Sequence, residues 1–111
     1  MTDLAPGWQF FSNYAHVLVC LADNPELRLR DVAGRVGVTE RTALRLVSDL
    51  EEANVIKRVK EGRRNRYQIN LNAHLRHPIE AHCTVGELLR TVLSNKSATS
   101  VPNSRRRKSG Y

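Results

Sequence analysis

Ten residues near the middle of the sequence carry a dense run of positive charge. Between positions 57 and 66, six side chains are cationic and only Glu61 is anionic. The cations are Lys57, Arg58, Lys60, Arg63, Arg64 and Arg66. Guanidinium groups form forked hydrogen bonds to phosphate oxygens and guanine edges, and lysine binds phosphate as a point charge. A hairpin does not need such a run for its own structure, so the pattern indicates contact with a polyanion.

A second group of candidate binding residues precedes this run. Apolar side chains recur at i, i+3, i+4 and i+7 within residues 40–53, and they are Ala43, Leu46, Val47 and Leu50. This spacing predicts an amphipathic helix with one buried face. The opposite face carries Arg41, Arg45, Ser48 and Glu52. Thr39 is a good N-cap, and its hydroxyl and that of Thr42 can donate to phosphate oxygens.

The cationic run lies within two stretches of alternating sequence. Residues 55–60 and 66–71 each alternate with a period of two, and a short segment containing Gly62 separates them. This pattern predicts a β-hairpin over about residues 55–70, with Arg63 and Arg64 at its tip. We expect Tyr67, Ile69 and Leu71 to be core residues.

Three further helices are predicted around these two elements. The first has an apolar face made of Phe11, Tyr14, Ala15, Leu18, Val19 and Ala22, and it ends at Asn24 and Pro25. A short helix over residues 29–36 ends at Gly37, where a left-handed residue is favoured. The last helix begins with a capping box formed by Thr84 and Glu87. Its wide apolar face contains Val85, Leu88, Leu89, Val92 and Leu93.

The length and charge of the chain limit the choice of function. Its 111 residues suffice for one domain, and the net charge of +7, with 14 Arg to 4 Lys, favours a nucleic acid or an anionic membrane as partner. No apolar run is long enough to span a membrane. We expect residues 1–94 to form the domain and residues 95–111, with the run Arg105 to Lys108, to form a disordered basic tail.

The order of helix, short helix, glycine turn, longer helix and basic hairpin resembles a winged helix-turn-helix. Residues 29–71 carry the resemblance and read LRDVAGRVGVTERTALRLVSDLEEANVIKRVKEGRRNRYQINL. They look like the DNA-binding core of MarR-like and ArsR-like bacterial regulators. The resemblance implies a mainly α fold with a small β-hairpin (α+β), in which a three-helix core carries a wing and a C-terminal helix.

The implied function is sequence-specific binding of double-stranded DNA by a transcriptional regulator. Residues 40–53 would lie in the major groove, and the hairpin would contact the backbone or minor groove. The implied DNA-binding residues are Thr39, Arg41, Thr42, Arg45, Ser48, Lys57, Arg58, Lys60, Arg63, Arg64 and Arg66. Leu44, at the edge of the outward face, would pack on a neighbouring element or touch a thymine methyl group. A homodimer formed through the flanking helices, in the cytoplasm on the nucleoid, completes the expectation.

Several alternatives stay open at this stage. Winged helices also serve as protein–protein scaffolds that bind no DNA. A metal-responsive ArsR-like repressor would draw on His16, Cys20, His74, His77, His82 and Cys83, but no CxxC pair occurs, and we expect no metal or other cofactor. RNA is disfavoured because its major groove is too narrow for a helix. No nucleotide-binding or nucleophile motif suggests an enzyme. The cluster Trp8, Phe10 and Phe11 is expected in the core, unless it forms a subunit contact.

Overall fold

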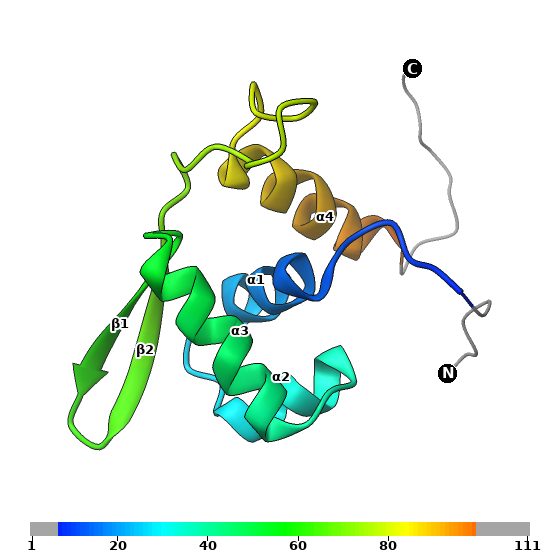
Figure 1. Cartoon of the computed structure of the whole chain (residues 1–111). Helices are drawn as coiled ribbons and strands as arrows, with labels where there is room; N and C mark the ends of the chain where they lie inside the picture. Colours follow the sequence, from blue (N-terminus) through cyan, green and yellow to red (C-terminus); the bar gives the residue numbers. More distant parts are fainter. Residues whose placement is uncertain (1–6, 100–111) are drawn as a thin grey trace.

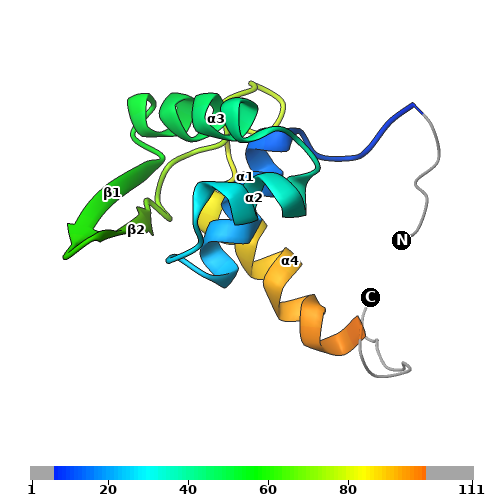
Figure 2. The ribbon, with the colours of Figure 1, turned by 90° about the horizontal axis from the view of Figure 1, so that it is seen from below.

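The computed structural model describes residues 7–99, in which a body of helices carries a hairpin that projects from one side (Figure 1). The elements are α1 (Asn13–Asp23), α2 (Leu29–Val36), α3 (Glu40–Glu52), β1 (Ile56–Glu61), β2 (Arg64–Ile69) and α4 (Val85–Thr99). This arrangement confirms the predicted α+β class. The hairpin and α4 project on opposite sides of the body formed by α1, α2 and α3, as Figures 1 and 2 both show.

The turn between α2 and α3 is fixed by local chemistry at its two ends. Gly37 has a left-handed conformation with φ 90°, and its N–H donates to the carbonyl of Ala33 at 2.8 Å. The Thr39 hydroxyl accepts a hydrogen bond from the Thr42 N–H at 3.1 Å and so caps α3. Both features match the prediction, and they direct α3 across α2.

The core lies where α1 meets the other elements. Its largest fully buried side chains are Val17, Leu21 and Val32. The predicted α1 face omitted Val17 and Leu21 and included Tyr14, which is exposed. That prediction was wrong because α1 contacts α2, α3, α4 and β2, so its buried surface extends around the helix beyond one stripe.

The hairpin is an antiparallel pair in which Ile56 lies opposite Ile69 and Glu61 opposite Arg64. Gly62, with φ 63°, is the first residue of the two-residue turn, where a left-handed conformation is required for this kind of hairpin. The other edge of β2 is also occupied, since the Tyr67 N–H donates to the carbonyl of Pro25 at 3.0 Å. The loop between α1 and α2 is thereby tied to the hairpin.

The start of the hairpin is anchored to the end of α3. Asn54 adopts a left-handed conformation with φ 63°, and the N–H of Val55 returns to the carbonyl of Leu50 at 3.0 Å. The Asn70 side chain donates to the Asn54 carbonyl at 3.3 Å, and the Asn70 N–H donates to the Val55 carbonyl at 2.8 Å. The orientation of the hairpin relative to α3 is therefore held by hydrogen bonds at its base.

The predicted capping box starts α4. The Thr84 N–H donates to the Glu87 carboxylate at 2.8 Å, and the Glu87 N–H donates to the Thr84 hydroxyl at 3.2 Å. Gly86 is buried, and a Cβ added there would meet the Leu71 carbonyl oxygen at 3.0 Å. The helix runs on to Thr99, past the boundary expected at residue 94. The predicted basic run 105–108 lies outside the described residues.

Two expectations about the core were wrong. Leu71 is 54% exposed, because β2 ends at Ile69 and the strand alternation no longer applies beyond it. Phe10 is 86% exposed and Trp8 67% exposed, with Phe11 exposed as well. These aromatic residues precede α1, which begins at Asn13, so they do not share its buried face. Within residues 7–99, no helix combines the length and apolar character needed to cross a membrane.

Candidate nucleic-acid interface

Helix α3 presents one face to the core and the other to solvent. Its four predicted core residues, Ala43, Leu46, Val47 and Leu50, are all buried. The outward residues Arg41, Arg45 and Ser48 are exposed, as is Thr39 at the N-cap, and Thr42 is half-buried. Leu44 is 48% exposed and so does not pack fully on a neighbouring element. A single helix with such a face has the shape and groups required to enter a major groove.

The hydroxyls at the start of α3 already take part in local hydrogen bonds. The Thr39 hydroxyl donates to the Thr42 hydroxyl at 3.1 Å while accepting from the Thr42 N–H. The Thr42 hydroxyl keeps its own proton for another acceptor. Together with the partial positive charge at a helix N-terminus, this leaves the first turn of α3 suited to a phosphate oxygen.

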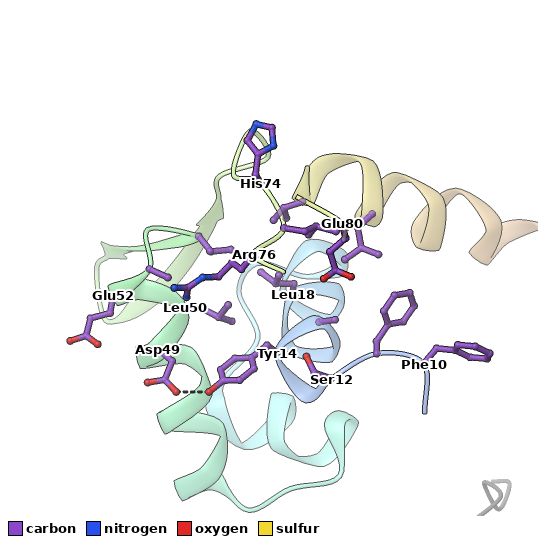
Figure 3. Close-up of a pocket in the computed structure, with 17 residues that line it drawn as sticks. Phe10, Ser12, Tyr14, Leu18, Asp49, Leu50, Glu52, His74, Arg76 and Glu80 are labelled. Carbon is purple, nitrogen blue, oxygen red and sulfur yellow. Dashed lines mark hydrogen bonds between the residues drawn. The ribbon is translucent and has the colours of Figure 1, made fainter. Parts of the chain in front are cut away.

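The proposed base-contacting residue Arg45 belongs to a small network. Its guanidinium lies 3.7 Å from the Asp49 carboxylate one turn along α3. Tyr14 reaches across from α1 and donates its hydroxyl to the same carboxylate at 2.6 Å, as the dashed line in Figure 3 marks. This hydrogen bond to an anionic acceptor raises the pKa of Tyr14 above its ordinary value. Arg45 remains mostly exposed, with its side chain 62% accessible.

Tyr14 and Asp49 also border an open cavity of about 830 Å³ behind α3. Aromatic and aliphatic side chains of α1, α3 and α4 form much of its wall, and Arg76 and Glu80 come from the loop before α4 (Figure 3).

The cations of the hairpin divide into paired and unpaired groups. The Arg58 guanidinium forms two hydrogen bonds to Glu51 of α3, at 3.1 and 3.2 Å. Glu26, in the loop between α1 and α2, accepts from Arg66 at 2.7 Å and lies 3.6 Å from Arg64. In contrast, the exposed residues Arg41, Lys57, Lys60 and Arg63 form no ion pair within residues 7–99. Only part of the positive charge of the predicted binding residues is therefore unopposed within the described residues.

The predicted site left out two groups of charged residues near its members. Arg28 and Arg30 are exposed at the start of α2, directly after the loop that carries Glu26. The sequence shows these two arginines within three residues of each other, so this additional positive charge could have been recognised. The carboxylates Glu26, Glu51 and Asp49 were also missed. Glu26 is 40 residues from Arg66, so no spacing rule could have paired them.

The histidines and cysteines do not assemble into a site. The His74 Nδ1–H donates to the Ala81 carbonyl at 2.7 Å, and His77 Nδ1 accepts from the Ile79 N–H at 3.1 Å. Cys20 is buried, and its burial raises the pKa of the thiol. In the part of the chain that the structure describes, no three His, Cys, Asp or Glu side chains are grouped to hold a metal ion.

Comparison with known families gives a match for the central part of the chain. The model of the winged helix-turn-helix DNA-binding family matches residues 16–57. Residues 16–57 are therefore similar to this DNA-binding family, and the chain has the winged helix-turn-helix fold. The match begins within α1 and ends in β1, so it covers the two helices α2 and α3 completely.

Two solved structures share the fold of this winged helix-turn-helix chain. One is MepR, a transcription regulator of the Staphylococcus aureus multidrug efflux pump MepA, with a TM-score of 0.50 and 20% identity over 80% of this chain and 62% of MepR. The other is the PcaV transcriptional regulator from Streptomyces coelicolor, solved with its natural ligand, with a TM-score of 0.50 and 24% identity over 81% of this chain and 68% of PcaV. The chain therefore spans less than two thirds of MepR. A search of curated proteins gave no match.

Proposed function

We propose that this chain is a transcriptional regulator that binds double-stranded DNA sequence-specifically through α3 and the hairpin. The observation that carries the proposal is the pairing of two exposed cationic elements, the outward face of α3 and the wing formed by β1 and β2, within a winged helix-turn-helix domain. A protein–protein scaffold needs no cations on both elements. The fold shared with two transcription regulators favours the MarR-like form of the resemblance over the ArsR-like form.

In the proposed complex, α3 lies in the major groove and the wing lies along the backbone or the adjacent minor groove. Arg41 and Arg45 face base edges or neighbouring phosphates, because the N-terminal turns of such a helix reach the bases. Arg63, at the hairpin tip, reaches the sugar–phosphate backbone or a narrow minor groove, whose negative potential attracts arginine. The chemistry is binding, and we propose no enzymatic activity.

We also propose that the regulator is a homodimer that acts in the cytoplasm on the nucleoid. Two-fold symmetry matches palindromic operators, and dimers of this kind contact half-sites about one helical turn apart. The surface that supports this proposal lies away from the wing. It combines the exposed aromatic residues Trp8 and Phe10 with an apolar groove of about 260 Å³ between α1 and α4, lined by Phe11, Val19 and Val92 among others.

A mobility-shift assay with random-sequence duplex at two salt concentrations tests the DNA-binding proposal. Binding that neutralises about six phosphates should weaken roughly 10³-fold between 50 and 200 mM salt, because condensed counterions are released. Selection of bound genomic fragments then identifies the operator, and a recovered palindrome supports the dimer as well. Binding that does not change with salt, or no binding to any duplex, contradicts the proposal and favours a scaffold role.

A further inference from the structure

The acidic residue Glu26 occupies an unexpected place among the proposed DNA-binding groups. One of its carboxylate oxygens lies 2.7 Å from the Arg66 guanidinium, and the other lies 3.6 Å from that of Arg64. Arg64 and Arg66 are alternate residues of β2, so their side chains project from the same face of the hairpin. One carboxylate therefore bridges two of the six cations on the wing.

The position of Glu26 is fixed by the backbone next to it. The Pro25 carbonyl accepts the Tyr67 N–H at 3.0 Å, which joins the loop to the middle of β2. The Asn24 side chain accepts the Glu26 N–H at 3.1 Å. Glu26 is thus held beside β2 independently of its own carboxylate, and its side chain is 42% exposed.

We propose that the Glu26 carboxylate competes with DNA phosphate for Arg64 and Arg66 and so limits how many wing cations engage the backbone. This inference rests on the proposed DNA-binding function. A carboxylate and a phosphate offer the same forked acceptor geometry to a guanidinium group. Because the pairs are solvent-exposed, they contribute little to folding stability, so removing the carboxylate should change DNA binding more than it changes the fold. Glu26 acts as a positioning residue that tunes non-specific affinity.

The salt dependence of DNA binding gives the sharpest readout. The slope of log affinity against log salt counts neutralised phosphates at about 0.9 each, so Glu26→Gln should steepen it by about 1.8 for two released arginines. The affinity gain of E26Q over wild type should then be about twelvefold larger at 50 mM than at 200 mM salt. A role confined to holding the fold would not change this slope.

Glu61→Gln is the matched control. Glu61 lies on the same hairpin, opposite Arg64, and forms no ion pair with the residues that the structure describes. E61Q removes the same charge close to the same DNA without releasing an arginine, so its slope should stay near that of wild type. A slope for E26Q that equals the slope for E61Q overturns the proposal, and so does weaker binding by E26Q.

A mutant cycle distinguishes competition by Glu26 from any structural change caused by E26Q in the loop between α1 and α2. Amide exchange of the Tyr67 N–H shows whether the loop still pairs with β2. Replacing Arg64 and Arg66 by alanine together should reduce the slope more in the E26Q background than in wild type. Equal reductions in both backgrounds mean that phosphate takes the two arginines whether or not Glu26 is present, and they refute the competition.

Elution from immobilised heparin separates this inference from the proposed function. Heparin is a polyanion that requires no operator sequence, so available arginines delay elution even if the chain recognises no duplex. E26Q should elute at higher salt than both wild type and E61Q. If the chain binds no duplex but E26Q still elutes after wild type and E61Q, only the DNA-binding function is contradicted. If E26Q and E61Q elute together, the proposed role of Glu26 is contradicted.

Discussion

At the scale of single residues, the candidate interface is a balance between cations and nearby carboxylates. Arg45, Arg58 and Arg66 each have an acidic partner within the domain. Exposed ion pairs of this type contribute about 0–1 kcal/mol to folding stability, so they orient a guanidinium group with little effect on the stability of the fold. Arg41 and Arg63 have no such partner among the described residues. Substitution of these two arginines is therefore the clearest test of whether α3 contacts bases and the wing contacts the DNA backbone.

Arg41→Ala and Arg63→Ala should have different effects on DNA binding. Arg41 lies in the first turn of α3, and loss of a forked contact to guanine costs about 1–3 kcal/mol of discrimination, so R41A should relax base preference at one operator position. R63A should weaken binding to all sequences alike and reduce the salt slope by about 1. Competition binding against single-base operator variants measures both effects. A uniform loss for R41A, or a base-specific loss for R63A, would reverse the assignment.

At the scale of elements, short-range signals were sufficient for most of the fold. Periodicity, the Thr39 cap and Gly37 define α2 and α3, and strand alternation around Gly62 defines the hairpin, because each of these depends on residues within one or two turns of chain. The same signals did not reveal that Val17 and Leu21 would be buried. The burial of these two residues depends on how many other elements pack around α1, and the apolar periodicity of α1 alone does not contain this information.

The placement of the candidate binding residues on α3 and the hairpin was predictable to a similar degree, and their contact with DNA stays a prediction. The residue types on α3 and the wing follow from the sequence, since both elements follow from local patterns. Their pairing with carboxylates does not, because Glu26 and Arg66 meet only after the loop joins β2. The exposed positions of Trp8 and Phe10 were not decided by the sequence, since hydrophobicity alone does not distinguish a core residue from an exposed one.

The capping box of α4 leads to a prediction about pH. The hydrogen bond from the Thr84 N–H lowers the pKa of Glu87 below its ordinary value of about 4.5. A depressed folded-state pKa means that the ionised carboxylate stabilises the fold above about pH 4.5, and that this contribution is lost as pH falls through the folded-state pKa. Gln keeps an acceptor for the cap but has no charge. Glu87→Gln should therefore be less stable than wild type at pH 7, and the difference should vanish in acid.

Urea unfolding of E87Q and wild type from pH 7 to pH 2 measures this difference. Glu80→Gln serves as the control, because Glu80 is an exposed residue of the preceding loop whose carboxylate makes no hydrogen bond within residues 7–99. The stability of E80Q should follow that of wild type across the range. A stability difference for E87Q that persists at pH 2 would show that the substitution acts through packing and not through the ionised cap.

At the scale of the whole molecule, the two proposed surfaces do not compete. The hairpin extends from one side of the body and α4 from the other (Figures 1 and 2). Trp8 and Phe10 form an edge-to-face pair, with ring centroids 4.9 Å apart, on the segment before α1. Exposed aromatic residues of this size are common anchors of protein interfaces. A dimer built on this surface leaves both wings free to contact DNA.

Replacing Trp8 and Phe10 together by serine tests this arrangement. If both are buried anchors worth about 2 kcal/mol or more each, the double variant should dimerise at least about 700-fold more weakly, as sedimentation equilibrium would show. Ile79→Ser is the control, since Ile79 is an equally exposed apolar residue of the loop before α4, and it should remain dimeric. The weakened variant should still bind one operator half-site, with the salt slope per chain unchanged, because the wing is intact. A wild-type chain that sediments as a monomer, or a double variant that dimerises as strongly as I79S, would exclude this surface as the subunit contact.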